Sequence, residues 1–196
     1  MRTITPMTPD PLRVVLPRGV VVHTRPIPPE DKEILQEGLA RLSEVSNYFR
    51  FHRIVRELSD AELTYLTELD QHDHAAWGCL VEDDGELQPA GIARYVRLKG
   101  ETQAEAAVTV LDEYQGLGIG SFLLSVLSRT AMANGVDQFV GMVLAENRKM
   151  IEVFGQMGAT TRVDDSMAIA ELPLPLAHEW AAEVADRVVE HFDELG

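Results

Sequence analysis

Cysteine is nearly absent from this chain of 196 residues, in which Cys79 is the one thiol. A single thiol forms no internal disulfide, which excludes a disulfide framework of the kind found in small secreted domains and favours a reducing compartment. Cys79 stands in the apolar run 75–81, where no neighbouring charge would activate a thiolate. We therefore expect a buried core thiol rather than a nucleophile.

Basic residues are also scarce, with 17 lysines and arginines against 32 acidic residues and a formal net charge of −15. Nucleic-acid binding draws its affinity from lysines and arginines that neutralise phosphates, so we expect no nucleic-acid partner. No apolar run reaches the length of a membrane span, and residues 1–11 hold no apolar core of a signal peptide. We expect no membrane association and a cytoplasmic location.

What the chain does contain is the composition of one soluble domain, with 45% hydrophobic and 25% charged residues. The prolines within 1–18 predict an extended N-terminal arm. An α/β domain is expected over 19–172, and an amphipathic helix over 173–196. The apolar stripe of that helix consists of Leu176, Trp180, Val184, Val188 and Phe192. We expect it to pack on its own domain, while a dimer contact is the alternative, so the protein is a monomer or a homodimer.

Strand and helix signals alternate through the central domain. Two helices are expected after the first strand, one over about 30–43 and one that begins at the capping box 59–62. Another helix ends near 134, and further strands follow a last short helix. The expected strands before that helix cover 19–24, 74–82, 90–98, 102–111 and 138–143. This order predicts a mixed central sheet flanked by helices.

The most informative stretch is 108–121, in which a β-branched run enters a turn with three alternating glycines and leads into an apolar helix. Closely spaced glycines bring several backbone N–H groups to the positive end of a helix, and such a turn holds a phosphate or pyrophosphate. A flexible turn without a ligand is the alternative. The loop lacks the lysine of a Walker sequence, and its glycine spacing differs from a dinucleotide fingerprint.

A third kind of phosphate loop, Gln/Arg-x-x-Gly-x-Gly/Ala, matches 115–120, and the segment 146–159 follows at the distance expected for the same family. Over roughly residues 19–172 the chain resembles the GCN5-related N-acetyltransferases, or GNAT family. The resemblance implies a single GNAT-type α/β domain, acetyl-CoA as co-substrate, no metal and an amine as acceptor.

The resemblance also implies a cofactor site. In the family the pantetheine arm pairs with backbone of the first of two splayed strands, and an amide near Val110 would face the thioester oxygen. The pyrophosphate lies on the glycine loop, and an asparagine binds the arm. Carried onto this sequence, the cofactor-binding residues are Val108, Thr109, Val110, Gln115, Gly116, Leu117, Gly118, Ile119, Gly120, Ser121 and Asn147.

Glu105 is the candidate general base. The segment 104–110 resembles the catalytic domain of bacterial protein lysine acetyltransferases, in which a glutamate on this strand is the base. We expect a partly desolvated carboxylate beside the acetyl group. Strict alternation puts Glu105 and Val110 on opposite faces, and a β-bulge, common in this strand of the family, would change that parity. A solvent-facing glutamate without a catalytic role is the alternative.

Two histidines and two aspartates stand close together in 70–74. A solvated turn is expected there, and metal ligation is the alternative, although no cysteine or second histidine pair supports it. The resembled subgroup carries a histidine that faces the catalytic glutamate. The resemblance therefore implies that His74, or as a second choice His72, contacts Glu105 and modulates its charge.

The general acid departs from the family pattern. Seven residues after Asn147 many members carry a tyrosine that protonates the leaving thiolate, and this chain has Phe154. Tyr114 and Ser121 are the remaining candidate donors, and protonation by water is the alternative.

The favoured function is transfer of acetyl from acetyl-CoA to a protein lysine, because the likeness to the protein acetyltransferases extends to 46–52, 58–63 and 91–96. A small-molecule amine N-acetyltransferase of the same fold is the first alternative. The second is an acyl-CoA-binding sensor without turnover, which Phe154 favours and an intact Glu105 opposes.

Overall fold

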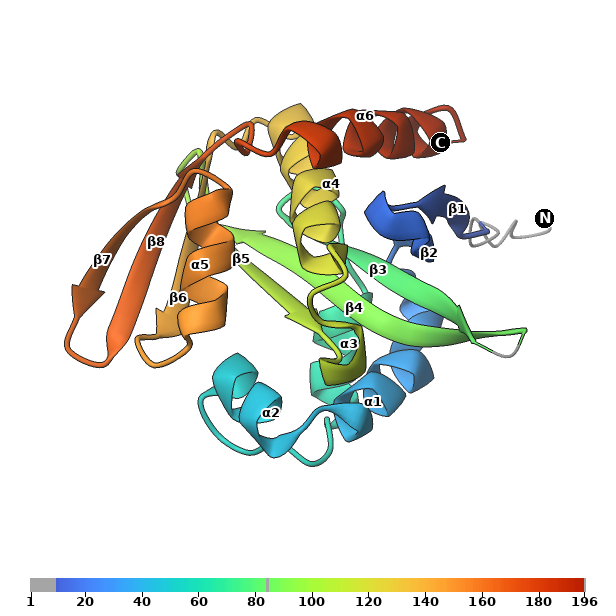
Figure 1. The fold of residues 1–196 in the computed structure, drawn as a ribbon, viewed down its shortest axis with the longest axis horizontal. Helices are drawn as coiled ribbons and strands as arrows, with labels where there is room; N and C mark the ends of the chain where they lie inside the picture. The colour runs from blue at the N-terminus through green and yellow to red at the C-terminus, as the bar shows by residue number, and fades with distance from the viewer. Residues whose placement is uncertain (1–9, 84, 196) are drawn as a thin grey trace.

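The computed structural model describes residues 10–83 and 85–195. Its centre is an 8-stranded sheet in the order β1-β2-β3-β4-β5-β6-β8-β7, with helices on both faces (Figure 1). The strands are β1 Leu12–Val15, β2 Val21–Pro26, β3 His74–Asp83, β4 Glu86–Arg97, β5 Gln103–Val110, β6 Gln138–Leu144, β7 Thr160–Asp164 and β8 Met167–Pro173. The helices are α1 Lys32–Arg41, α2 Glu44–Phe51, α3 Asp60–Thr67, α4 Ile119–Ala133, α5 Arg148–Gln156 and α6 Glu179–Asp193.

The sheet divides at the parallel pair β5–β6. Strands β1 to β5 pair antiparallel in sequence order, and β6, β8 and β7 form a second antiparallel set. Between the sets, pairing runs from Gln103 with Gln138 to Glu105 with Val140. Within the described chain, β5 and β6 then continue to Val110 and Leu144 without pairing to each other. The two strands therefore diverge and leave an opening inside the sheet.

The main core lies on the face covered by α4. This helix is apolar around most of its circumference because it is enclosed, with the sheet on one side and α6 on the other (Figure 1). Phe122, Leu123 and Leu127 are 0% exposed, and each buried side chain of this size contributes roughly 1.5–3 kcal/mol. The five residues of the predicted α6 stripe all belong to this cluster or pack against it, so packing on the own domain is confirmed.

The opposite face carries α1 and α3, which share a smaller cluster around Leu39, Val55 and Leu58. The predicted capping box at the start of α3 is confirmed. Ser59 N–H donates to the Glu62 carboxylate at 2.8 Å, and Glu62 N–H donates to Ser59 Oγ at 3.3 Å. These bonds satisfy N–H groups that have no partner within the helix, which fixes where α3 begins.

Three features differ from the sequence-based expectation. The predicted N-terminal arm contains a short strand, β1, which pairs with β2. Helix α6 begins at Glu179 rather than directly after the prolines. Between α1 and α3 lies a third helix, α2, for which Ser43 provides the N-cap by accepting the Ser46 N–H at 3.1 Å. Its 8 residues give too few turns for a clear apolar period, so the sequence pattern did not reveal it.

Two expectations from composition can be compared with the structure. Cys79 is 1% exposed in the core, as predicted, and its burial raises the pKa of the thiol to about 12. Among the helices of the described residues, none has the length and apolar character needed to cross a bilayer.

We predict that Cys79 resists alkylation in the folded protein. Since the thiolate is the nucleophile and burial disfavours it, native protein at pH 8 should react with a maleimide about a hundred-fold or more slowly than protein unfolded in urea. Mass spectrometry over a time course measures both rates. Equal rates in the two states would contradict the buried position.

Candidate active site

A cleft of about 1450 Å³ occupies the opening where β5 and β6 diverge. One wall is β5 with the loop that leads into α4, a second is β6 with α5, and α2 adds a third. The structure brings most of the predicted site residues together here. Those that line the cleft are Glu105, Val108, Thr109, Val110, Gln115, Gly116, Gly118, Gly120, Ser121 and Asn147. Leu117 and Ile119 instead pack into the core.

The backbone of β5 presents polar groups to the cleft. Leu111 N–H donates to Ala90 O at 2.9 Å on the β4 side. Because N–H groups alternate along an antiparallel ladder, Thr109 also directs its backbone to β4, although the residue lines the cleft. The N–H and C=O groups of Val108 and Val110 therefore point toward the opening between β5 and β6. In the described chain Val110 O already accepts a hydrogen bond from Gln115 Nε2 at 3.1 Å, so the groups left for an extended ligand are the N–H and C=O of Val108 and the N–H of Val110.

The glycine loop forms the N-terminus of α4. Gly116 and Gly118 have φ values of 76° and 87°, a region that side-chain-bearing residues seldom adopt, and Gly118 is the N-cap. No side chain of the described residues caps this end of α4, so its first N–H groups stay available to a ligand. A Cβ at Gly118 would meet the Trp180 ring at 3.4 Å, and one at Gly120 would meet Val110 Cγ2 at 3.6 Å.

Polar contacts attach α2 to this loop. Gln115 Nε2 donates to Val110 O at 3.1 Å and approaches Ser46 Oγ at 3.4 Å. The Asp112 carboxylate accepts Ser43 N–H at 3.0 Å and the hydroxyls of Ser43 and Ser46 at 2.9 and 2.8 Å. Although partial burial acts to raise the pKa of Asp112, these hydrogen bonds lower it on balance. The hydrogen bonds of the Asp112 carboxylate therefore fix α2 against the glycine loop and keep it in the wall of the cleft.

The solvent exposure of Glu105 differs from expectation. Its side chain is exposed rather than partly desolvated, while Ala104 and Ala106 on either side are 0% and 4% exposed. The β-bulge that would change the parity between Glu105 and Val110 is not formed in β5, because β5 pairs with β4 without interruption. The bulge lies in β4 instead, where Ala90 has no partner on β3. Glu105 and Val110 consequently point to opposite faces of the sheet.

Glu105 interacts electrostatically with Arg50 of α2. Burial lowers the pKa of the Arg50 guanidinium, and the charge of Glu105 opposes that change. In the described chain Arg50 makes no hydrogen bond or ion pair, and its guanidinium lies 5.2 Å from the centroid of the Phe51 ring. Arg50 was not singled out from the sequence, because its position depends on the docking of α2.

The predicted contact between His74 and Glu105 is not formed. The sheet register aligns both residues with Val96, so a complete strand separates them. His74 Nε2 instead lies 3.3 Å from Arg94 Nη1, and its ring lies 4.8 Å from the Tyr65 ring. Burial lowers the pKa of His74, and the charge of Arg94 lowers it further. The role of His74 as a modulator of Glu105 therefore has no support in this geometry.

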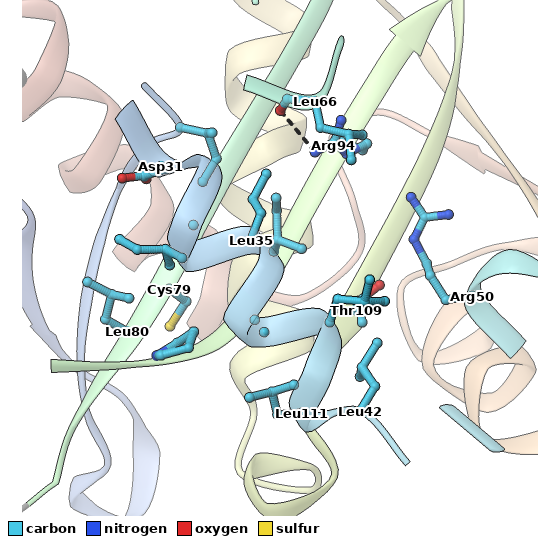
Figure 2. A pocket seen from close by; sticks show the side chains of 18 of the residues that line it. Asp31, Leu35, Leu42, Arg50, Leu66, Cys79, Leu80, Arg94, Thr109 and Leu111 are labelled. Carbon is cyan, nitrogen blue, oxygen red and sulfur yellow. Dashed lines mark hydrogen bonds between the residues drawn. The ribbon is translucent and has the colours of Figure 1, made fainter. Parts of the chain in front are cut away.

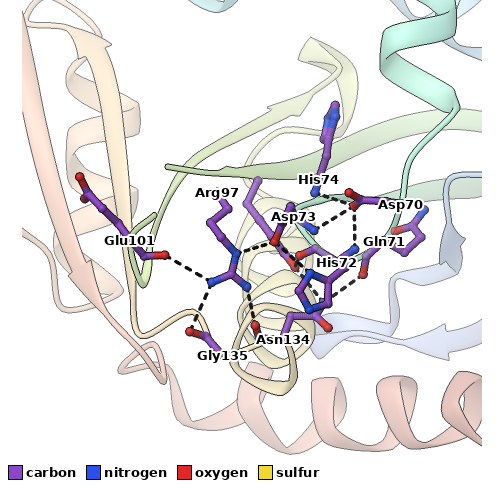
Figure 3. A network of polar contacts seen from close by, with 10 residues as sticks. Asp70, Gln71, His72, Asp73, His74, Arg97, Glu101, Asn134 and Gly135 are labelled. Atoms are coloured by element: carbon purple, nitrogen blue, oxygen red, sulfur yellow. Dashed lines mark hydrogen bonds and ion pairs between the residues drawn. The ribbon is translucent and has the colours of Figure 1, made fainter. Parts of the chain in front are cut away.

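The segment 70–74 builds a turn, as predicted (Figure 3). The Asp70 carboxylate accepts the backbone N–H groups of His72, Asp73 and His74 at 2.8–2.9 Å. Arg97 Nε donates to Asp73 at 2.6 Å, and the same guanidinium bonds to carbonyls at the end of α4. Nowhere in the described residues do three or more histidines, cysteines or acidic residues gather as metal ligands. The contacts of Asp70, Asp73 and Arg97 therefore connect β3, β4 and the end of α4.

Asn147 and Phe154 lie at opposite ends of the cleft-facing side of α5. The Asn147 Oδ1 caps the helix by accepting Met150 N–H at 3.2 Å, and within the described chain its amide nitrogen has no hydrogen bond. Phe154 is 2% exposed and packs on Gly141 of β6, where a Cβ would lie 2.5 Å from the ring. The pairing of a large ring with a glycine explains how Phe154 fits at this position.

The segment after β8 also reaches the cleft. Ala177 N–H donates to Met157 O at 3.0 Å, which brings His178 and Trp180 into the lining beside the glycine loop. His178 Nδ1 is buried and has no hydrogen-bond partner among the described residues. The helical period of the sequence predicts packing for Trp180, and no local signal points to His178 or shows that this segment returns to the loop.

A parallel pair that opens inside a mixed sheet, with a glycine turn and a helix N-terminus at its mouth, defines an acyltransferase-type domain. The acetyltransferase (GNAT) family matches residues 42–159, and the chain belongs to this family. An acetyltransferase of Pseudomonas aeruginosa is 36% identical over 159 residues, covering 80% of this chain and 86% of that protein.

Two further similarities concern proteins called Pat. The acetyltransferase Pat of Mycolicibacterium smegmatis is 38% identical over 168 residues, covering 84% of this chain but 49% of that protein. The chain thus spans about half the length of that relative. The GNAT domain of S. lividans PAT superimposes with a TM-score of 0.76 at 29% identity, covering 84% of this chain and 97% of the other. The predicted family and fold class are confirmed.

Proposed function

We propose that this acetyltransferase moves the acetyl group of acetyl-CoA to the side-chain amine of a protein lysine. The observation that carries the proposal is the arrangement of the cleft, in which unpaired β5 backbone leads from the uncapped N-terminus of α4 toward Glu105. The similarity to the Pat proteins supports the same reaction class.

Coenzyme A would lie along β5. Its pyrophosphate fits the glycine loop, where the N–H groups of α4 and the helix dipole favour an anion. The pantetheine arm then follows the backbone of Val110 and Val108, and one of these N–H groups stabilises charge that develops on the thioester oxygen. Asn147 would use its unbonded amide nitrogen to hold the arm from the α5 side.

Glu105 would act as general base at the end of the opening. A lysine amine is protonated at neutral pH, and it attacks a thioester only after losing a proton. Glu105 accepts that proton, directly or through a water molecule, and the neutral amine attacks the acetyl carbon. The exposed position in the free protein suits this role, because the acceptor must reach the carboxylate before both are enclosed.

The leaving thiolate needs a proton that Phe154 cannot provide. Tyr114 and Ser121 both line the cleft and carry hydroxyl groups, so each is a candidate donor. Arg41 Nη2 donates to the Tyr114 hydroxyl at 3.4 Å, a contact that helps to position the phenol. Protonation by water needs neither group.

Mass spectrometry of lysate proteins after incubation with labelled acetyl-CoA tests the acceptor. Lysine labelling that requires the added protein supports the proposal. A cytoplasmic location of the reaction is part of the same proposal. Ready acetylation of polyamines or amino sugars without any lysine labelling would establish the small-molecule alternative instead. Binding of acetyl-CoA without turnover on either acceptor would establish the sensor.

We predict that salt slows acetylation of a protein acceptor. A net charge of −15 attracts lysine-bearing partners, and salt screens this attraction over about 8 Å near physiological ionic strength. Between 20 and 200 mM salt, the second-order rate at low acceptor concentration should fall by about two- to ten-fold. A small monoamine acceptor serves as the control and should change less. A salt-independent rate on protein acceptors would show that the acidity serves solubility alone.

A further inference from the structure

A side chamber of about 120 Å³ lies between α1 and the face of the sheet formed by β3, β4 and β5 (Figure 2). Most of its lining is apolar and comes from α1 and the strands beneath it. Arg50, Phe51 and Thr109 line both this chamber and the cleft, so the two spaces adjoin. The chamber is on the face toward which Glu105 points, opposite to α4.

Among the described residues, two arginines at this chamber, the buried Arg94 and the half-buried Arg50, have no anionic partner within bonding distance. Arg94 is 7% exposed, and its guanidinium makes two long contacts of 3.3 Å, one to His74 Nε2 and one to Leu66 O, the second of which is drawn in Figure 2. In the described chain neither Arg94 nor Arg50 forms an ion pair with a carboxylate. A buried charge is costly unless an opposite charge or strong hydrogen bonds compensate it.

The other charges of the chamber do not compensate these arginines. Arg25 and Asp31 also line it, but they form their own ion pair at 2.6 Å. Glu105 acts on Arg50 from the cleft side and is exposed to solvent. Burial and the charge of Arg50 lower the pKa of Arg94 to about 10, so Arg94 remains a cation at neutral pH. The chamber therefore carries an excess of positive charge inside an apolar wall.

We propose that this chamber binds a carboxylate carried on a short aliphatic stem. The two guanidinium groups supply the hydrogen bonds and charge that a carboxylate requires, and the apolar lining accepts the stem. An engineered cavity of about 150 Å³ accommodates benzene, so a space of about 120 Å³ suits a stem of a few carbons. Such a carboxylate could belong to the acyl group of coenzyme A or to the amine acceptor, if the proposed transfer operates here.

A binding experiment on the free protein tests the chamber without requiring turnover. Ligand-observed NMR titrations compare butanoate with 1-butanol, which has a similar stem without the charge. We expect butanoate to bind about ten-fold or more tightly than the alcohol. Equal affinity for the two ligands, or no binding of butanoate, would overturn the proposal, whatever the outcome for acetyl transfer.

Variants locate the binding. Arg94→Met replaces a buried cation by an apolar side chain of similar length and should abolish the preference for butanoate. Arg50→Gln should weaken butanoate several-fold and tests the same site where Arg94→Met fails to fold. Arg187→Met removes one exposed cation from α6 and should leave the preference unchanged. An undiminished preference in Arg50→Gln and in any folded Arg94→Met would overturn the proposal.

Competition then distinguishes the two sources of the carboxylate. If the acyl group carries it, saturating glutaryl-CoA should displace butanoate, whereas acetyl-CoA should not. If the acceptor carries it, butanoate should bind in the presence of either thioester. Both results support a carboxylate site. Displacement of butanoate by acetyl-CoA itself would overturn the proposal of a separate binding site, because butanoate would then occupy the cofactor cleft.

Discussion

Replacement of Gly118 by valine should weaken the binding of coenzyme A by about ten-fold or more. Gly118 is the N-cap of α4 at φ 87°, and a side chain there would both oppose this backbone conformation and enter the space beside Trp180. The N–H groups of the loop would then no longer converge on a pyrophosphate. Isothermal titration calorimetry measures the dissociation constant, and circular dichroism verifies the fold.

Two control variants separate lost binding from backbone strain. Gly100 has φ 79° in a turn where an added Cβ would meet nothing within 4 Å, so Gly100→Val imposes similar strain, roughly 1–3 kcal/mol, outside the cleft. Its affinity for coenzyme A should equal that of the wild type. Gly120→Ala adds a Cβ at ordinary contact distance and should have little effect. Unchanged affinity in folded Gly118→Val would refute the assignment of the loop.

Replacement of Glu105 by glutamine should lower turnover by about a hundred-fold or more while nearly preserving the affinity for acetyl-CoA. Glutamine keeps the shape of the side chain but does not accept the proton of the amine. The exposed position of Glu105 argues against a fold defect as the cause of lost activity. Steady-state kinetics with a lysine peptide measures turnover, and calorimetry measures affinity.

The pH dependence gives a second readout for Glu105. A general base is active when ionised, so the wild-type rate should rise with pH through one ionisation that the variant lacks. Glu101→Gln removes one exposed negative charge just before β5, outside the cleft, and should leave the rate and its pH dependence unchanged. Near-normal turnover in Glu105→Gln with an unaltered pH profile would leave Glu105 as a surface residue.

Local sequence signals predicted the parts of the structure that local chemistry determines. The capping box at Ser59, the glycine turn before α4 and the buried strand around Cys79 each follow from residues close in sequence. The apolar stripe of α6 likewise follows from the helical period. These features needed no knowledge of distant contacts.

The features that sequence reasoning missed depend on tertiary contacts. The short helix α2 is held by Asp112, which lies more than 60 residues away, and it brings Arg50 to the chamber. The sequence left open whether a bulge interrupts β5; the irregularity lies between β3 and β4 instead, and its place depends on how each strand pairs with both of its neighbours. His74 contacts Arg94 through strand register, which a single strand does not reveal.

The division of the sheet at β5 and β6 would give the proposed coenzyme the position of a missing strand. Within residues 10–83 and 85–195, only a short stretch of ladder, from Gln103 with Gln138 to Glu105 with Val140, joins the two halves of the sheet directly. An extended pantetheine arm bound to Val108 and Val110 would continue that ladder and bridge the gap with its own hydrogen bonds. If the proposed binding mode holds, the protein keeps an incomplete sheet in its interior, and the reaction would take place where a small molecule completes that sheet.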